Sequence, residues 1–284
     1  MINRYYKTNI ECNGSDANKV NLLIERKETE LTEIKGGCLF SGEEEDCFSH
    51  DSRDLIFFIT HGTGTIKLSE KIYSVKKGNL VYIPACTAYQ ISASTDSCID
   101  YIQFHIFDQV SAESDSVFSK GIGKKEQTAK TAENDKVKII KNHLAEPICL
   151  SNPDQGKVYE FGSNTTTLLL ERNNTNNVEF ALIRWPEGSR GAMAAHKDKE
   201  QSFYILSGNG QVTIDGKTEE VNPGHVVFVP RATPHTSEAL EGDLVYLCLN
   251  SLVNPNDESF DTMYKRIIPG RMKRWKDGKD EIGE

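Results

Sequence analysis

Hydrophobic and polar positions alternate in short runs along much of the chain, and glycine or proline interrupts these runs. Residues 203–206, 211–214 and 225–229 are short runs rich in aromatic and β-branched residues, and each has the length of a strand. Asp215-Gly216 is a strong hairpin signal between two such runs, and Pro230 closes the third, where a missing N–H does no harm. Many short strands with this punctuation predict an all-β sandwich or barrel.

This pattern occurs twice in the chain. Residues 61–89 align without a gap with residues 207–235, an offset of 146 residues. The glycines and prolines that punctuate the strands fall on one another in the two copies: Gly62, Gly64, Gly78 and Pro84 on Gly208, Gly210, Gly224 and Pro230. An internal repeat of this length predicts two domains of the same fold.

The repeat and the polar stretch between its copies set the expected boundaries. We expect a first barrel over residues 1–112, a linker or surface loop over 113–135, and a second barrel over 136–284. The end of the chain, over residues 257–274, has helical spacing, with Phe260, Met263 and Ile267 on one face. Such a helix is expected to pack outside a barrel or across a dimer.

Composition narrows the class of protein. Hydrophobic residues make up 37% of the 284 residues and charged residues 26%, which is typical of a globular protein. The net charge of −9 argues against nucleic acid as a partner. No apolar stretch is long enough to span a membrane, and the first residues lack the apolar segment of a secretory signal. The seven cysteines, odd in number and irregular in spacing, predict reduced thiols in a cytoplasmic protein.

Two short motifs in the second copy resemble those of the cupin superfamily, and the repeat resembles its two-barrel members, the bicupins. Gly224, Pro230 and His235 have the spacing of the second cupin motif, and residues 201–208 are similar to the end of the first. The resemblance implies two tandem double-stranded β-barrels, jelly-roll-like, with a short C-terminal helix. It also implies one divalent metal ion inside a barrel, held by imidazoles and a carboxylate, with iron, manganese, nickel or zinc as candidates.

The second barrel carries the residues for such a site. By the resemblance, with a slip of one residue, the metal ligands are His196, Asp198, Gln201 and His235. The family's histidine pair would otherwise fall on Ala195 and Lys197, and Gln201 stands where the family has a glutamate. The alternative is that His196 and His235 are polar residues of the barrel mouth that contact only water.

Two further residues are catalytic candidates. Glu200 adjoins Gln201, and a small bulge would turn its carboxylate inward as a metal ligand in place of Gln201. If Glu200 or Asp198 is not a ligand, its carboxylate could move a proton. Arg231 lies near the expected mouth, where its guanidinium would hold a substrate carboxylate, although a solvated loop arginine is the simpler interpretation.

The first barrel is degenerate at the equivalent positions. His50 matches His196, but Leu55 stands where the second barrel has Gln201, and Tyr89 where it has His235. We therefore expect no metal there, and either a structural role or an apolar pocket for a small ligand.

The leading hypothesis is a metal-dependent small-molecule enzyme, an isomerase, lyase or oxygenase acting on a small polar carboxylate- or sugar-like substrate. The alternative is a small-molecule-binding or sensor bicupin without catalysis, which the missing glutamate favours. A structural or storage bicupin is a third hypothesis. We expect a homodimer with a small-molecule partner, and neither a membrane nor a nucleic acid partner.

Overall fold

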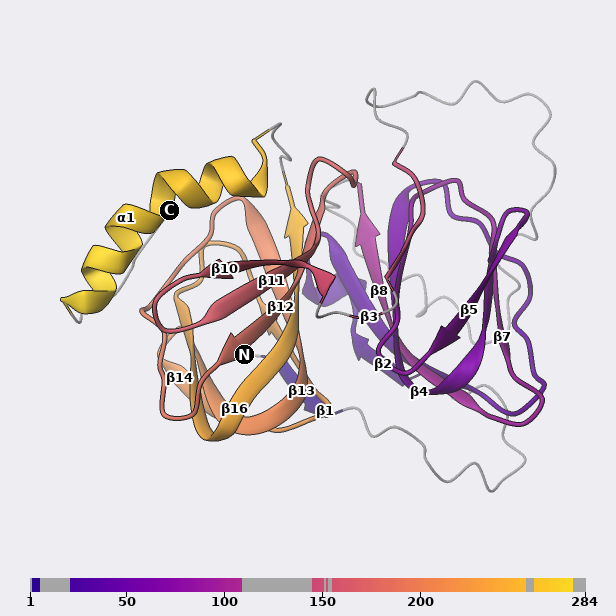
Figure 1. The fold of residues 1–284 in the computed structure, drawn as a ribbon, viewed down its shortest axis with the longest axis horizontal. Helices are drawn as coiled ribbons and strands as arrows, with labels where there is room; N and C mark the ends of the chain where they lie inside the picture. Colours follow the sequence, from indigo (N-terminus) through magenta and orange to yellow (C-terminus); the bar gives the residue numbers. More distant parts are fainter. Residues whose placement is uncertain are drawn as a thin grey trace. The chain divides into compact units, whose positions relative to one another are not determined.

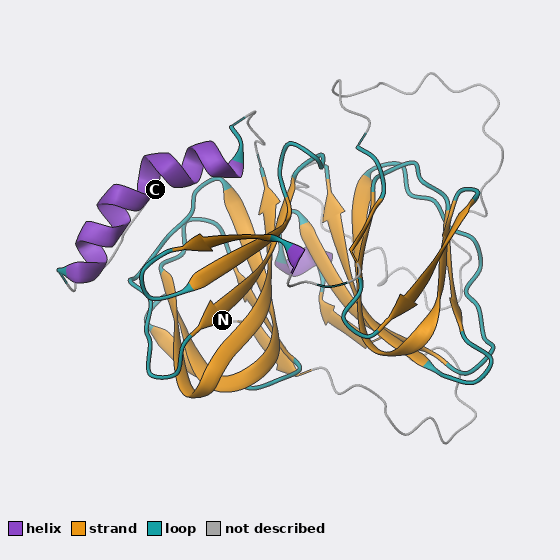
Figure 2. Cartoon of the chain, viewed as in Figure 1, coloured by secondary structure: helices purple, strands orange, loops and turns teal. Residues whose placement is uncertain are grey.

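The computed structural model describes residues 2–5, 21–108, 145–150, 152, 155–253 and 258–277. Strands dominate these residues, and α1 (Phe260–Lys276) is their one α-helix (Figure 2). The described residues form two compact units. The first contains residues 21–28, 32–108, 145–150 and 152, and the second contains residues 2–5, 29–31, 155–253 and 258–277.

The first unit is a barrel of antiparallel strands (Figure 1). Its strands run in the order β2-β3-β8-β4-β6-β9, and β5 and β7 both pair with β4. Alternate residues of β4, namely Leu55, Phe57 and Ile59, point into a core that also contains Tyr101. Its elements are β2 (Asn21–Ile24), the 3-10 helix η1 (Arg26–Glu28), β3 (Thr32–Leu39), β4 (Arg53–Leu68), β5 (Lys71–Lys76), β6 (Leu80–Ile83), β7 (Tyr89–Ala93), β8 (Ile99–Phe107) and β9 (Ile148–Leu150).

The second unit is a barrel of the same kind with α1 lying against it (Figure 1). Its strands run in the order β1-β15-β13-β16-β12-β11-β10, and β14 pairs with β13. Phe203 and Ile205 of β13 pack in its core with Val227 and Leu244. The strands are β1 (Ile2–Tyr5), β10 (Lys157–Glu160), β11 (Thr165–Leu170), β12 (Val178–Trp185), β13 (Lys199–Ile214), β14 (Lys217–Val221), β15 (His225–Val229) and β16 (His235–Leu252).

The two units confirm the all-β repeat seen in the sequence. The long strands β4 and β13 each contain 16 residues and begin and end at the offset of the repeat. The hairpin at Asp215-Gly216 is also confirmed, with φ of 50° and 74°, the left-handed conformation that such a tight turn requires. The break expected after residue 206 is wrong: β13 continues through Gly208 because shifts in its pairing register with β16 bend it without ending it.

Two short strands differ from the expected boundaries. Ile148–Leu150, expected in the second barrel, pairs as β9 with β6 of the first. Ile2–Tyr5, expected in the first barrel, pairs as β1 with β15 of the second. In each case the short strand extends a sheet at its edge, where unpaired backbone N–H and C=O groups can hydrogen-bond to an extended segment from elsewhere in the chain. The expected linker, 113–135, lies outside the described residues.

The expected C-terminal helix is confirmed as α1. The hydroxyl of Ser259 caps its first turn by accepting a hydrogen bond from the Thr262 N–H, at 3.2 Å. Its apolar face packs on the second barrel in a cluster of buried residues, Phe260 and Ile267 from the helix with Tyr159, Phe161 and Leu168 from the barrel. No helix in the described ranges is long and apolar enough to cross a membrane. The six cysteines placed in the structure form no disulfide.

The glycine at the bend of β13 offers a test of the fold. Gly208 has φ of 75°, and a Cβ there would overlap the Asp243 carbonyl. Gly216 has φ of 74°, but nothing lies within 4 Å of its Cβ position. We expect Gly216→Ala to lose about 1–2 kcal/mol of unfolding free energy, for the left-handed backbone alone, and Gly208→Ala to lose about 1–3 kcal/mol more because the strand must shift. Chemical denaturation of both variants measures the difference, and equal losses would contradict the close approach.

Candidate functional site

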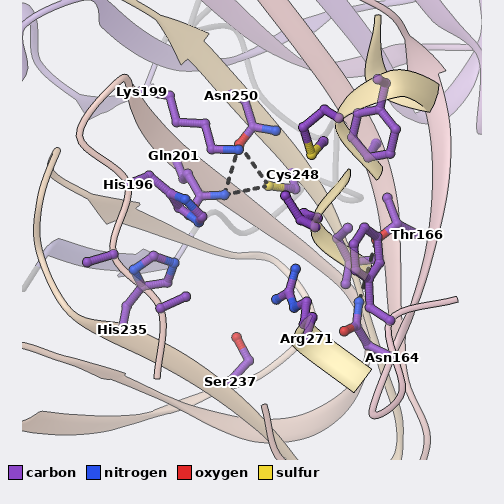
Figure 3. A pocket seen from close by; sticks show the side chains of 18 of the residues that line it. Asn164, Thr166, His196, Lys199, Gln201, His235, Ser237, Cys248, Asn250 and Arg271 are labelled. Carbon is purple, nitrogen blue, oxygen red and sulfur yellow. Dashed lines mark hydrogen bonds between the residues drawn. The ribbon is translucent and has the colours of Figure 1, made fainter. Parts of the chain in front are cut away.

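A cavity of about 530 Å³ opens inside the second barrel. Alternate residues of the strands line it, because successive side chains of a strand point to opposite faces of the sheet. Gln201 and Phe203 of β13, His235 and Ser237 of β16, and Ile183 of β12 all face this space. Phe260, Met263, Ile267 and Arg271 of α1 also line it, so the helix completes its wall (Figure 3).

Two neutral imidazoles lie together in the cavity. The ring centres of His196 and His235 are 5.5 Å apart. Burial lowers the pKa of His196 well below its ordinary value of 6.5 and lowers that of His235 to about 4. The Nδ1 of His235 lies 2.9 Å from the carbonyl of Thr233, which can only accept, so Nδ1 carries the proton and Nε2 holds a lone pair.

A buried hydrogen-bond chain fixes the amide of Gln201. Its Nε2 donates to Asn250 Oδ1 at 2.8 Å, and Asn250 Nδ2 donates to Glu179 Oε2 at 3.4 Å. The other carboxylate oxygen of Glu179 accepts from Arg172 Nε at 2.6 Å, in an ion pair that is buried on both sides. The chain runs from a buried ion pair to the cavity, and it leaves Gln201 Oε1 with no hydrogen-bond partner among the described residues.

Aromatic and sulfur side chains form another part of the cavity wall. Trp185 Nε1 donates to the hydroxyl of Tyr246 at 3.0 Å, and the Phe203 ring packs on Tyr246 with ring centres 4.7 Å apart. Burial raises the pKa of the Cys248 thiol to about 12, so Cys248 stays protonated at neutral pH. This wall therefore provides apolar contact and neutral hydrogen-bonding groups, and no thiolate nucleophile.

Two basic side chains approach the imidazoles from different elements. Lys199 begins β13, and Arg271 extends from α1 into the cavity, where its guanidinium also lies 4.7 Å from the centre of the Phe161 ring (Figure 3). Their positive charges lower the pKa of both His196 and His235, in addition to the larger effect of burial. The electrostatic character of the cavity interior is therefore positive.

The structure brings only part of the predicted site together. His196, Gln201 and His235 share the cavity, whereas Asp198, although it lines the rim, is exposed to solvent. The predicted catalytic role of Glu200 is not supported, because the pairing of β13 at Gln201 is regular and Glu200 faces outward. Its buried carboxylate accepts the backbone N–H groups of Glu30 and Leu31, at 2.5 and 2.9 Å.

Arg231 also lies away from the cavity. Its guanidinium forms an ion pair with Glu30 at 2.5 Å and donates to the Lys197 carbonyl at 3.2 Å. Arg231 and Glu200 thus hold the segment of residues 29–31 against the second barrel, which is a structural role. Arg271, which the sequence analysis did not single out, is the arginine that faces the cavity.

The donor set does not fit a divalent metal ion. Two imidazoles and one amide oxygen face the cavity, and no group of three or more His, Cys, Asp or Glu side chains suited to a metal occurs in the described parts of the chain. Divalent-metal sites in proteins usually have at least three strong ligands from imidazole, carboxylate or thiolate groups, and only two imidazoles and a weaker amide oxygen face this cavity. Lys199 and Arg271 line the same cavity, and their positive charges would repel a metal cation. The predicted four-ligand site is therefore not assembled.

The first barrel holds a polar cluster at the equivalent place. His50 Nε2 lies 3.1 Å from the hydroxyl of Tyr89, and its Nδ1 lies 2.9 Å from Arg53 Nη2. A second imidazole, His105, was not predicted from the sequence, and its ring centre lies 6.1 Å from that of His50. Burial, and then the charge of Arg53, lowers the pKa of His50 to about 3. These contacts indicate a structural role for the cluster.

Comparison with known proteins identifies the second barrel. Residues 181–250 match the family described as Cupin domain. An uncharacterised protein of Methanocaldococcus jannaschii, MJ1618, is 38% identical over 53 residues, which are 19% of this chain and 42% of that protein. Quercetin 2,3-dioxygenase of Bacillus subtilis is 26% identical over 83 residues, which are 29% of this chain and 25% of the dioxygenase. The matches thus span less than half of either relative.

Solved structures extend the likeness to both barrels. The oxalate decarboxylase of Lactobacillus farciminis, solved as a formate complex, aligns with a TM-score of 0.63 at 13% identity, over 92% of this chain and 88% of that one. The Bacillus subtilis oxalate decarboxylase, from a study of the EPR parameters of its Mn(II) centres, aligns with a TM-score of 0.58 at 15% identity, over 87% of this chain and 80% of that one. At these identities the likeness shows the fold alone. The second barrel therefore contains a cupin domain, and the two barrels together share the fold of these two-barrel proteins.

Proposed function

We propose that the second barrel binds a small organic molecule without catalysing a reaction on it. The cavity of about 530 Å³ carries this proposal, because it has the size and mixed lining of a small-molecule site. Apolar walls from Phe203, Ile183 and α1 surround a few polar groups, including His235 Nε2 and Ser237. Cupin barrels serve both as enzymes and as binding modules, so the choice between these two functions depends on the residues of the site and not on the fold.

The chemistry of the lining favours binding over catalysis. The His235 imidazole, with a pKa of about 4, is a weak base at neutral pH, and the Cys248 thiol stays protonated. The carboxylate of Glu200 faces away from the cavity, and that of Glu179 is held by Arg172. A binding module needs none of these groups to be reactive.

Tryptophan fluorescence tests the proposal directly. Trp185 lines the cavity, and Trp275, the other tryptophan of the chain, does not. In a Trp275→Phe background, titration with a panel of small acids, amides and polyols should change the emission of Trp185 for at least one compound and raise the melting temperature. Ala192→Phe, which fills the cavity rim, should abolish the change, whereas Ala88→Phe in the first barrel should not. A panel without effect on either readout would overturn the proposal.

Metal analysis separates this function from the competing metal-dependent enzyme. Elemental analysis of protein purified without added metal should find no stoichiometric iron, manganese, nickel or zinc. Near-stoichiometric metal that disappears in His235→Ala would support the enzyme instead.

A further inference from the structure

We infer that the molecule bound in the second barrel is an organic carboxylate, held by Lys199 and Arg271. This inference rests on the proposed function and assigns the chemical class of its ligand. The Lys199 ammonium and the Arg271 guanidinium line one cavity, and they come from elements far apart in the sequence, β13 and α1.

Few carboxylates occur among the described residues that line the cavity, and none of them forms an ion pair with Lys199. The two acidic residues of the lining are Asp198, which is exposed to solvent, and Glu258, which forms an ion pair with Arg266 at 3.1 Å. The Lys199 ammonium makes no ion pair or hydrogen bond with the side chains or backbone of the described residues, although the Lys199 backbone pairs with Leu252 in the sheet. Cationic groups beside apolar walls are poorly solvated, so an anion bound in the same cavity is favoured. The effect of both charges on the pKa of His196 and His235 supports their orientation toward this space.

Helix α1 holds Arg271 in place against the barrel. The Phe260 N–H donates to Glu171 Oε1 at 2.9 Å, and the Tyr264 hydroxyl donates to the Glu160 carbonyl at 2.8 Å. Further along the helix, the Arg271 guanidinium lies on the Phe161 ring. These contacts anchor the helix before and at Arg271, so the guanidinium is positioned in advance. Such preorganisation reduces the entropy lost on binding a carboxylate.

The rest of the lining describes the body of the ligand. Beyond the two cations, the wall is apolar at Ile183, Phe203, Met263 and Ile267, which suits a hydrocarbon or aromatic group. A carboxylate attached to such a group fits both parts of the cavity. A bare inorganic anion would leave the apolar part without a partner.

Matched acid and amide pairs test the assignment, because they differ mainly in charge. We name benzoate and benzamide, phenylacetate and phenylacetamide, and hexanoate and hexanamide, with inorganic phosphate as a fourth probe. Binding to the full chain is followed by Trp185 fluorescence in the Trp275→Phe background and by calorimetry. At least one acid should bind at least about tenfold more tightly than its amide, a difference worth roughly 1.4 kcal/mol.

Three variants locate the charge partners. Lys199→Met and Arg271→Met should each weaken binding of the acid at least about tenfold and leave that of the amide unchanged. Lys273→Met, an exposed position on the same helix, should change neither. Circular dichroism melting of each variant confirms that it is folded.

The outcomes distinguish this inference from the proposed function. Amides that bind as tightly as acids, or variants that keep the preference for acids, would overturn the carboxylate assignment while the binding function stands. Phosphate that binds as tightly as the acids would overturn it as well, because the apolar body would then contribute nothing. A complete lack of binding by acids, amides and the wider panel would overturn the proposed function itself.

Discussion

Replacing Arg172 with methionine is expected to destabilise the second barrel by about 3–5 kcal/mol. The side chains of Arg172 and Glu179 are only 4% and 0% exposed, and one carboxylate oxygen of Glu179 accepts from the guanidinium at 2.6 Å. The variant leaves the Glu179 charge buried without its partner, which is the costly way to break such a pair. The second oxygen of Glu179 is bonded to Asn250, so the loss also reaches the chain that orients Gln201.

Urea denaturation followed by tryptophan fluorescence measures this effect in the second barrel, because both tryptophans of the chain belong to that unit. The double variant Arg172→Met/Glu179→Leu is the matched control. Since it removes both charges, it should lie within about 2 kcal/mol of the wild type. A double variant as unstable as Arg172→Met would show that the loss comes from packing and not from the unpaired carboxylate.

Much of the fold was predictable from the sequence because local rules govern it. The offset of the repeat placed β4 and β13 correctly, and Asp215-Gly216 marked a real hairpin. Helical spacing found α1. The strands β1 and β9 could not be assigned to their barrels, because a strand of three or four residues carries no signal for the edge that it joins.

The candidate site was predictable only for residues whose side-chain direction follows from the alternation along a single strand. The two-residue period of β13 turned Gln201 and Phe203 inward, as expected, and the same rule turns Glu200 outward unless a bulge intervenes. The register shifts of β13 begin after Ile205, beyond the site, so no bulge turns the Glu200 side chain toward the cavity. Attention to this alternation would also have identified His105, which lies on the same face of β8 as Tyr101.

Arg271 shows what a pattern in the sequence cannot reveal. It lies on a helix near the end of the chain, and nothing in its neighbourhood differs from a solvated basic helix face. It becomes a site residue because Phe260 and Ile267 pack on the barrel and place the next turn of α1 over the cavity. Arg231, in contrast, is close to His235 in sequence but has an ion-pair partner in Glu30. Proximity along the chain was therefore a poor guide to which arginine serves the cavity.

Acid should destabilise the first barrel through the His50 cluster. Burial, and then the charges of Arg53 and Lys35, lowers the pKa of His50 from 6.5 to about 3 in the folded chain. His105 and Tyr89 also face this imidazole, and burial lowers the pKa of His105 well below its ordinary value. Between pH 6.5 and about 3, His50 takes up a proton in the unfolded chain but not in the folded chain. The stability that neutral His50 provides is therefore fully present above about pH 6.5 and declines as the pH falls toward about 3.

The expected loss from His50 alone is about 3 kcal/mol at about pH 4.5, and it grows until the folded imidazole also takes up its proton. His50→Gln keeps a polar group near the Tyr89 hydroxyl but cannot titrate, so its stability should fall less between about pH 7 and pH 4.5. The first barrel contains no tryptophan, so hydrogen exchange of peptides from β4 and β8 is the suitable measurement. His61→Gln, in the same barrel but outside the cluster, should retain the sensitivity of the wild type. Equal acid sensitivity in His50→Gln and wild type would contradict the prediction, because protonation of His50 would then not cause the loss of stability.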